Sequence, residues 1–534
     1  MAGFFDRPFG RPSRQLTPAD QALVLNMAGF ALRAIGRLPD AVEPMHAAAE
    51  TSAEQENWKD AAAGFGNLSE LLVTLGRLES RGAGSQRATH DGETAGYQSA
   101  PHAGALETAA QAVHFADKIT PADLFRQITA RASQHAAALL ARGRLAEAEE
   151  RFREAERLQQ QHQPTLPRLY SMQGFLYGDL LLARRRPQEA ADRAEYRLKV
   201  VMQGSRNLLD IGLAELQRAQ AQSRLISLSP PLPISPSPHL HSTALTALQR
   251  ANQEAYIVAG YLARTEASLE WLSRCGGFQP PSDDTAAGSH RFGSPELQAE
   301  IEPDLLEAET LARRSPMPLF HAEVHLLRAR LAIVVFRSAK ERPLPQGPKA
   351  NEEPSAAGER SEDAAFAERK ATIHRDAAAE LIARHHYGRR EPDLAVLDAE
   401  ITPGADTFAA ACERVSEGWW HLLDRLEQLA QDHADQIPDA TEMLAPLLEA
   451  EKEYHAERDA YLQEQQAATA SSAAGGADNP LGELMTEVVL DGLPDEVLQQ
   501  IADQAGQPAN WRQWPAELQQ HVVRLVVQSR ESSD

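Results

Sequence analysis

The chain has 534 residues and a formal net charge of -23 at pH 7. Its length exceeds the roughly 250 to 300 residues that one hydrophobic core supports, so we expect several domains or one elongated array. The negative charge repels phosphate backbones and anionic lipid headgroups, which argues against general binding to nucleic acid or to a membrane surface. Aromatic residues make up only 6% of the chain, and with abundant alanine this favours close helix packing and an all-α fold.

Three Gly-Arg-Leu sequences, beginning at Gly36, Gly76 and Gly143, each follow an apolar helical stretch. A glycine just past a helix takes the left-handed conformation that ends it. Asp40 and Glu147 then suit the first turn of a following helix, where the helix dipole favours negative charge. Each sequence therefore predicts a helical hairpin, and recurring hairpins predict a solenoid.

Small residues lie where the two helices of a predicted hairpin cross, as at Gly29 and Ala41 in the first one. A glycine or alanine at a crossing lets two helix axes approach closely. This arrangement resembles the tetratricopeptide repeat (TPR), and segments such as ARGRLAEAEERFREAERLQ and LARRSPMPLFHAEVHLLRARLAI resemble the repeat arrays of bacterial multidomain signal-transducing ATPases. The resemblance implies a right-handed α-solenoid of tetratricopeptide helical hairpins with a C-terminal helical extension. The ATPase module has no counterpart here, because no GxxxxGK[ST] phosphate loop occurs.

Composition divides the chain further. Runs rich in proline, glycine and serine predict loop insertions in the array near residues 80–104, 227–238, 275–294 and 343–359. The expected order is an irregular N-terminal segment 1–20, the solenoid 21–401, a helical hairpin 402–467, a linker 468–480 and a small helical segment 481–534.

Within the predicted hairpin, apolar residues from Phe408 to Leu429 repeat at intervals of four and three, which predicts a heptad seam on one helix. Trp419 falls in that seam and is expected to pack in the core. The neighbouring Trp420 is a candidate for contact with a partner.

Few residues point to chemistry. His321 and His325 lie one helical turn apart, as a metal pair requires, but Glu323 occupies the wrong position for an HExxH site, so histidines on a repeat helix are the favoured interpretation. Two cysteines without CxxC spacing predict neither a disulfide framework nor a zinc site. The run Arg184 to Arg186 before a proline is expected to be a solvated turn. No catalytic residue, metal or cofactor is assigned.

The TPR resemblance implies a ligand surface on the concave side, formed by first-helix residues that do not pack within a hairpin. The chain mostly lacks the lysines and asparagines of a peptide-carboxylate clamp there. The candidate partner-contacting residues are Asn26, Phe30, Arg33, Glu70, Phe175, Asp179 and Trp420.

We therefore expect a non-enzymatic scaffold that binds a peptide or helix of a partner protein, with no nucleic acid or membrane involved. The first twenty residues are unlike a signal peptide, and no apolar run approaches the ~20 residues of a membrane helix, so a cytoplasmic location is expected. The alternatives are a regulatory subunit of a signalling NTPase system acting in trans and, more remotely, a metal-dependent hydrolase centred on His321 and His325.

Overall fold

A computed structural model describes residues 4–5, 12–79, 104–203, 206–228, 239–275, 295–340 and 355–474. Within these ranges every regular element is a helix, apart from one antiparallel bridge between Phe5 and Pro12. The prediction of an all-α fold is confirmed. The chain divides into two compact units, Met1–Glu451 and Lys452–Asp534, and the account below concerns the first.

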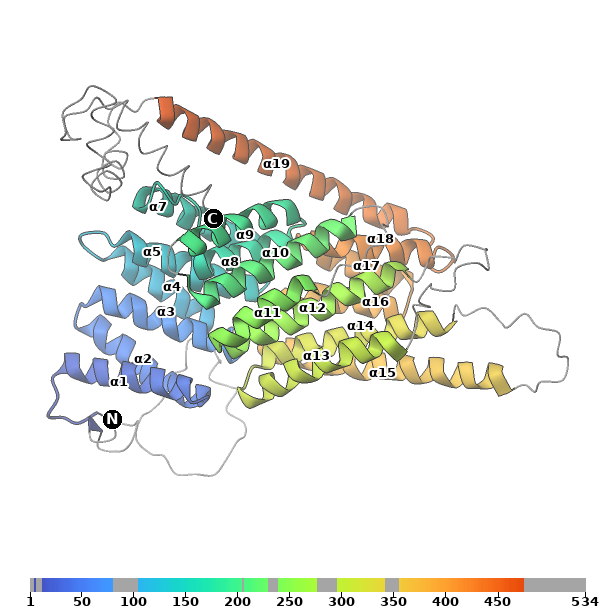
Figure 1. The fold of residues 1–534 in the computed structure, drawn as a ribbon, viewed down its shortest axis with the longest axis horizontal. Helices are drawn as coiled ribbons and strands as arrows, with labels where there is room; N and C mark the ends of the chain where they lie inside the picture. The colour runs from blue at the N-terminus through green and yellow to red at the C-terminus, as the bar shows by residue number, and fades with distance from the viewer. Residues whose placement is uncertain are drawn as a thin grey trace, which may run out of the picture. The chain divides into compact units, whose positions relative to one another are not determined.

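Consecutive helices pack on each other along the first unit, and they form two alternating series (Figure 1). The A series comprises α1 (Pro18–Ala34), α3 (Trp58–Thr74), the π-helical turn η2 (Ala130–Ala136) with α6 (Ala137–Ala141), α8 (Ser171–Ala183), α10 (Leu208–Leu228), α12 (Glu254–Cys275), α14 (Pro318–Lys340), α16 (Glu391–Ile401) and α18 (Leu423–Asp432). The B series comprises α2 (Leu38–Glu54), α4 (Ala105–Asp117), α7 (Leu145–His162), α9 (Pro187–Gln203), α11 (His239–Ala251), α13 (Pro295–Arg314), α15 (Ser355–His385) and α17 (Ala405–Val415).

Members of the A series also contact one another from α3 onward: α3 packs on η2, η2 on α8, α8 on α10, and so on to α18. The A helices therefore form a continuous inner stack, and the B helices are added to it one by one. Shorter elements complete the unit: α5 (Leu124–Thr129) and the 3₁₀ turns η3 (Gly388–Arg390) and η4 (Trp420–Leu422). The last helix, α19 (Ala440–Ala474), begins in this unit.

The three predicted hairpin turns have the expected backbone. Gly36, Gly76 and Gly143 have φ of +77°, +64° and +78°, the left-handed region in which a glycine carries no steric penalty. Gly29 lies where α1 crosses α2, and a Cβ atom there would overlap the side chain of Met45. The structure therefore has left-handed glycines in the turns and a small residue at the helix crossing, as the sequence predicts.

The same turns dock onto a later part of the chain. A Cβ at Gly76 would lie 2.7 Å from Nδ1 of His385, and one at Gly143 would lie 2.8 Å from the carbonyl carbon of Gly388. Gly36 makes a looser contact, since a Cβ there would lie 3.8 Å from Oγ of Ser315. We call this contact the seam: the turns at 36, 76, 143 and 184–186 on one side, and residues 315–318, 385–388 and 418–421 on the other.

An apolar core joins the two sides of the seam. It contains Leu32 and Leu72 from the early helices together with Leu326, Ile382 and Leu397 from the later ones. The A-series stack therefore returns to its own beginning instead of ending as an open array.

The region after Ile401 is not the single continuous helix that the heptad pattern predicts. Helix α17 ends at Val415, Gly418 adopts φ +103°, and α18 begins only at Leu423. The heptad positions are nevertheless buried, with Phe408 and Leu426 at 0% exposure. At the break, Gly418 lies so close to the guanidinium of Arg184 that an added Cβ atom would overlap it.

The remaining boundary predictions have mixed outcomes. Helix α19 continues to Ala474, so the first half of the linker expected at 468–480 is helical. The segment 481–534 and most of the four predicted insertions lie outside the described residues. No helix in the described ranges is long and apolar enough to cross a membrane.

The seam predicts a position-specific cost for glycine replacement. Gly143→Ala forces a side chain into the left-handed region and against Gly388, so we expect unfolding free energy to fall by about 2–3 kcal/mol. Gly404→Ala is the matched control, because Gly404 has φ 176° and its added Cβ would meet nothing closer than 3.9 Å. Urea unfolding of both variants measures the difference, and equal stabilities would contradict the account of the seam.

Candidate functional site

The inner stack encloses a cavity of about 270 Å³. Its walls come from α3, α6, α8, α10, α12, α14 and the η3–α16 segment, all of them A-series helices or the turn that leads into one. Most of the wall is apolar, and we call this part the apolar lobe. Its principal side chains are Leu140, Phe175, Leu216, Tyr256, Phe320 and Leu327.

A smaller hollow of about 70 Å³ adjoins this cavity, and we call it the polar lobe. The two lobes share wall residues, among them Asp179, Glu266 and Arg389. The polar lobe also receives Trp419 and His421 from the far side of the seam. The polar lobe therefore has all of these wall residues only when the two sides of the seam are in contact.

Ion pairs hold the charged walls in place. Asp179 lies 2.6 Å from Arg389, and Glu266 lies 3.2 Å from Arg224. Burial alone would raise the pKa of Glu266, but Arg224, Arg390 and Arg330 together lower that pKa to about 2. The carboxylate is therefore ionised at neutral pH, and the arginines dominate the local potential.

A second ion-pair group stands beside the first. Arg390 pairs with Glu323 at 3.2 Å and with Asp393 at 3.3 Å. The hydroxyl of Tyr387 donates to Glu323. These contacts fix the start of α16 against α14, because each buried charge has an opposite charge beside it.

Four buried polar atoms of the polar lobe have no hydrogen-bond partner in the protein: Ser223 Oγ, His241 Nε2, Arg389 Nε and Trp419 Nε1. Ser223, His241 and Trp419 are exposed by only 4%, 2% and 1%. Buried polar groups are normally hydrogen-bonded, so several such atoms around one hollow call for an explanation.

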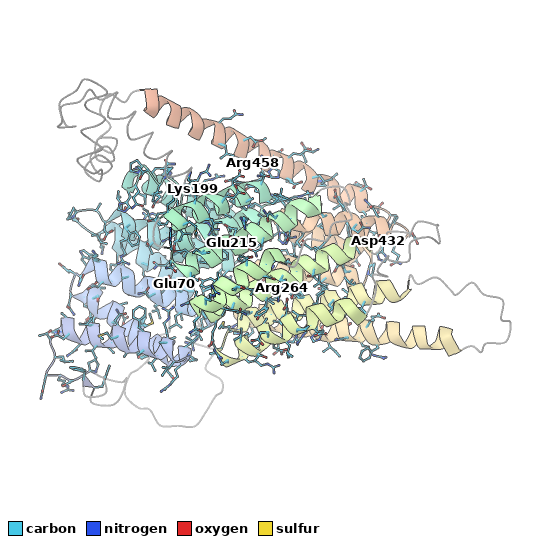
Figure 2. All side chains as sticks on the ribbon, in the orientation of Figure 1. Glu70, Lys199, Glu215, Arg264, Asp432 and Arg458 are labelled. Carbon is cyan, nitrogen blue, oxygen red and sulfur yellow. The ribbon has the colours of Figure 1, made fainter. Side chains whose placement is uncertain are left out.

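The sequence-predicted contact residues fall into two groups. Phe175 and Asp179 line the cavity, and Phe175 meets Tyr256 edge to face at 6.1 Å between ring centroids. Glu70, labelled in Figure 2, lies close enough to Arg33 and Tyr256 to interact electrostatically with both. Burial raises the pKa of Glu70, and Arg33 opposes that rise.

The other candidates lie apart from the cavity. Asn26 is half-buried, and Phe30 on α1 is 44% exposed. Trp420 is only 3% exposed, so the expectation that it contacts a partner is corrected: in this structure it packs in the interior next to Trp419. The reason is that Trp420 lies in the turn between α17 and α18, which packs against the end of α8.

The run Arg184 to Arg186 is not the solvated turn that the sequence predicts. Arg184 and Arg186 are 6% and 4% exposed, while Arg185 pairs with Asp424 at 2.7 Å across the seam. Arg186 lies 2.9 Å from Glu149.

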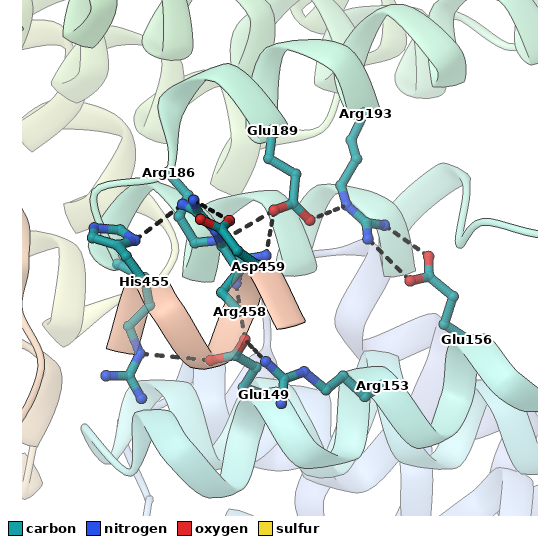
Figure 3. A network of polar contacts seen from close by, with 10 residues as sticks. Glu149, Arg153, Glu156, Arg186, Glu189, Arg193, His455, Arg458 and Asp459 are labelled. Atoms are coloured by element: carbon teal, nitrogen blue, oxygen red, sulfur yellow. Dashed lines mark hydrogen bonds and ion pairs between the residues drawn. The ribbon is translucent and has the colours of Figure 1, made fainter. Parts of the chain in front are cut away.

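Arg186 belongs to a network between α7 and α9 (Figure 3). It continues from Arg186 to Glu189 at 2.9 Å, then to Arg193 at 3.2 Å, and from there to Glu156 at 2.7 Å. Burial would raise the pKa of Glu189, but Arg186 and Arg193 lower it. The network is structural, since every charge in this series has an opposite neighbour.

The histidine pair of the metal hypothesis has a third histidine beside it. Nδ1 of His325 lies 3.0 Å from Nδ1 of His374, and burial lowers the pKa of both His321 and His325. In the part of the chain that the structure describes, no group of three or more His, Cys, Asp or Glu side chains is arranged to hold a metal ion.

Sequence reasoning missed Ser223, Arg224, His241 and Glu266 as wall residues. They lie on α10, α11 and α12, where polar residues are common, so the sequence offered no specific signal for them. These residues can be recognised as one site only once the fold is known, because the seam brings Trp419 and Arg389 beside them.

Comparison with known proteins identifies no relative: no protein-family model matches this chain, and no curated protein matches it.

The polar lobe predicts a pH dependence of stability. Burial, with Arg264 nearby, lowers the pKa of His241 to about 4 in the folded protein, whereas an unfolded histidine titrates near about 6.5. The unfolded chain therefore binds a proton first, and the stabilisation is complete above about pH 6.5 and is lost as pH falls toward 4.

The measurement is urea unfolding of the full chain between pH 8 and 4.5. The part due to His241 amounts to about 3 kcal/mol at most. His241→Gln should make the curve less steep between pH 6.5 and 4.5, and His374 and His421, whose folded pKa values are also lowered to about 4, contribute to the slope that remains. Losses from Glu266 fall in a lower window, below about pH 4.5, because its folded pKa is about 2. Parallel curves for the two proteins would refute the role of His241.

Proposed function

We propose that this chain is a non-enzymatic interaction scaffold of the cytoplasm, built as a right-handed α-solenoid of TPR-like hairpins, that binds a helix of a partner protein. The alternating A and B series, the small residues at helix crossings and the glycine turns support the TPR-like description. The two cysteines without a disulfide pattern support a reducing compartment.

The surface that carries this proposal is on α1. Leu23, Met27 and Phe30 are 56%, 49% and 44% exposed and repeat at i, i+4 and i+7, so they share one face of the helix. The guanidinium of Arg33 lies 5.8 Å from the ring of Phe30. We call these four residues the α1 stripe, and two of them are among the sequence-predicted contact residues.

A helix is the occupant that fits. Most A-series helices pack on A-series neighbours on both sides, whereas α1 begins the series and presents apolar residues to solvent at helix-packing spacing. An amphipathic helix laid on this face continues the stack with the same ridges-into-grooves packing. Much of the remaining inner face borders the cavity, between helices of the chain itself.

Site-specific photo-crosslinking from position 27 in the native host tests this proposal. We expect a discrete protein adduct whose yield falls at least tenfold when Phe30→Asp is added, because a buried charge in a helix interface costs several kcal/mol. Leu306→Asp is the matched control, since Leu306 is 61% exposed on the B-series helix α13.

An adduct that persists in Phe30→Asp, or that is lost equally in Leu306→Asp, would contradict the proposal. The identity of the crosslinked chain also separates the alternatives. A partner with a nucleotide-binding phosphate loop would favour a regulatory subunit acting in trans on a signalling NTPase.

A further inference from the structure

We propose that the joined apolar and polar lobes form a binding site for a small amphipathic carboxylic acid, with its carboxylate in the polar lobe and its apolar body in the apolar lobe. This site is separate from the α1 stripe and does not depend on the protein-binding role proposed above.

The unpartnered atoms define the head group. Trp419 Nε1 and Arg389 Nε are donors only, because indole and guanidinium nitrogens in proteins do not accept hydrogen bonds. Ser223 Oγ can donate as well. The polar lobe therefore offers at least two buried donors without an acceptor, and a carboxylate supplies acceptors only.

Charge in the polar lobe admits such an anion. Its lining contains three arginines, Arg224, Arg389 and Arg390, and three acids, Asp179, Glu266 and Glu270. Each of these arginines is ion-paired with an acid, so the wall is close to neutral before a ligand enters.

Size and lining define the body of the ligand. An apolar cavity of about 150 Å³ is enough to hold benzene, so the 270 Å³ of the apolar lobe accommodates a larger apolar group. Leu216, Tyr256 and Leu327 are among its walls. Asp179, Ala263 and Arg389 border both lobes, so the proposed ligand passes these side chains to reach from one lobe into the other.

The ligand also bridges the seam. Ser223 and His241 belong to α10 and α11, whereas Trp419 lies just before η4 and Arg389 lies in η3. A carboxylate bonded to atoms on both sides favours the closed state, since a ligand that binds only the folded, closed form stabilises it by mass action.

Octanoate is the probe for the test, with octylammonium as its oppositely charged counterpart. Isothermal titration calorimetry and thermal unfolding are performed on the full chain at pH 7.5. We expect octanoate to bind and to raise the unfolding temperature, and octylammonium to bind at least tenfold more weakly.

Two conservative variants locate the head group. Trp419→Phe removes one donor and keeps an aromatic ring, so octanoate affinity should fall about five- to tenfold. Trp420→Phe is the matched control, because that indole nitrogen is also buried without a partner but does not line either lobe. Ser223→Ala provides a second, smaller change on the opposite wall.

Phe30→Asp should bind octanoate normally, which separates this site from the α1 stripe. The proposal is overturned if octanoate does not bind at millimolar concentration, if octylammonium binds equally well, or if Trp419→Phe and Trp420→Phe have the same affinity. Those results would mean that water alone satisfies the four polar atoms.

Discussion

The close approach of the early hairpin turns to the later ones is the constraint on which this fold depends. At Gly143 the backbone must be left-handed and must lie against the backbone of Gly388. Only glycine satisfies both demands without strain. Side-chain hydrogen bonds to helix-end carbonyls add to the contact, because the last carbonyls of a helix have no partner within it. At the end of α8, for example, His421 Nδ1 donates to the Ala183 carbonyl at 3.3 Å.

This closure changes what the concave side of the array can do. In an open solenoid the inner face is a broad groove, whereas here the A helices face each other across a cavity. Charged residues such as Asp179 and Arg389 therefore become buried, and each needs a partner. The tight pairing of acids and arginines in the walls follows from this burial.

The structural features that the sequence predicted correctly are local ones. The left-handed turns, the crossing at Gly29 and the burial of positions from Phe408 to Leu429 all depend on residues near in sequence, and all are found. The close contact of Gly418 with Arg184, at the break, was not predictable, because the two residues are far apart in sequence. The burial of Trp420 and of Arg184 to Arg186 could not be predicted for the same reason, because it depends on contacts at the seam.

The two proposed sites differ in how they depend on closure. The α1 stripe lies on the first helix and needs only the local fold of α1 on α2, and two of its four residues, Phe30 and Arg33, were predicted from the sequence. The cavity needs residues from α8, α10, α11, η3 and the η4 turn together. A ligand that bridges these elements stabilises the seam and the core that spans it, from Leu32 to Leu397.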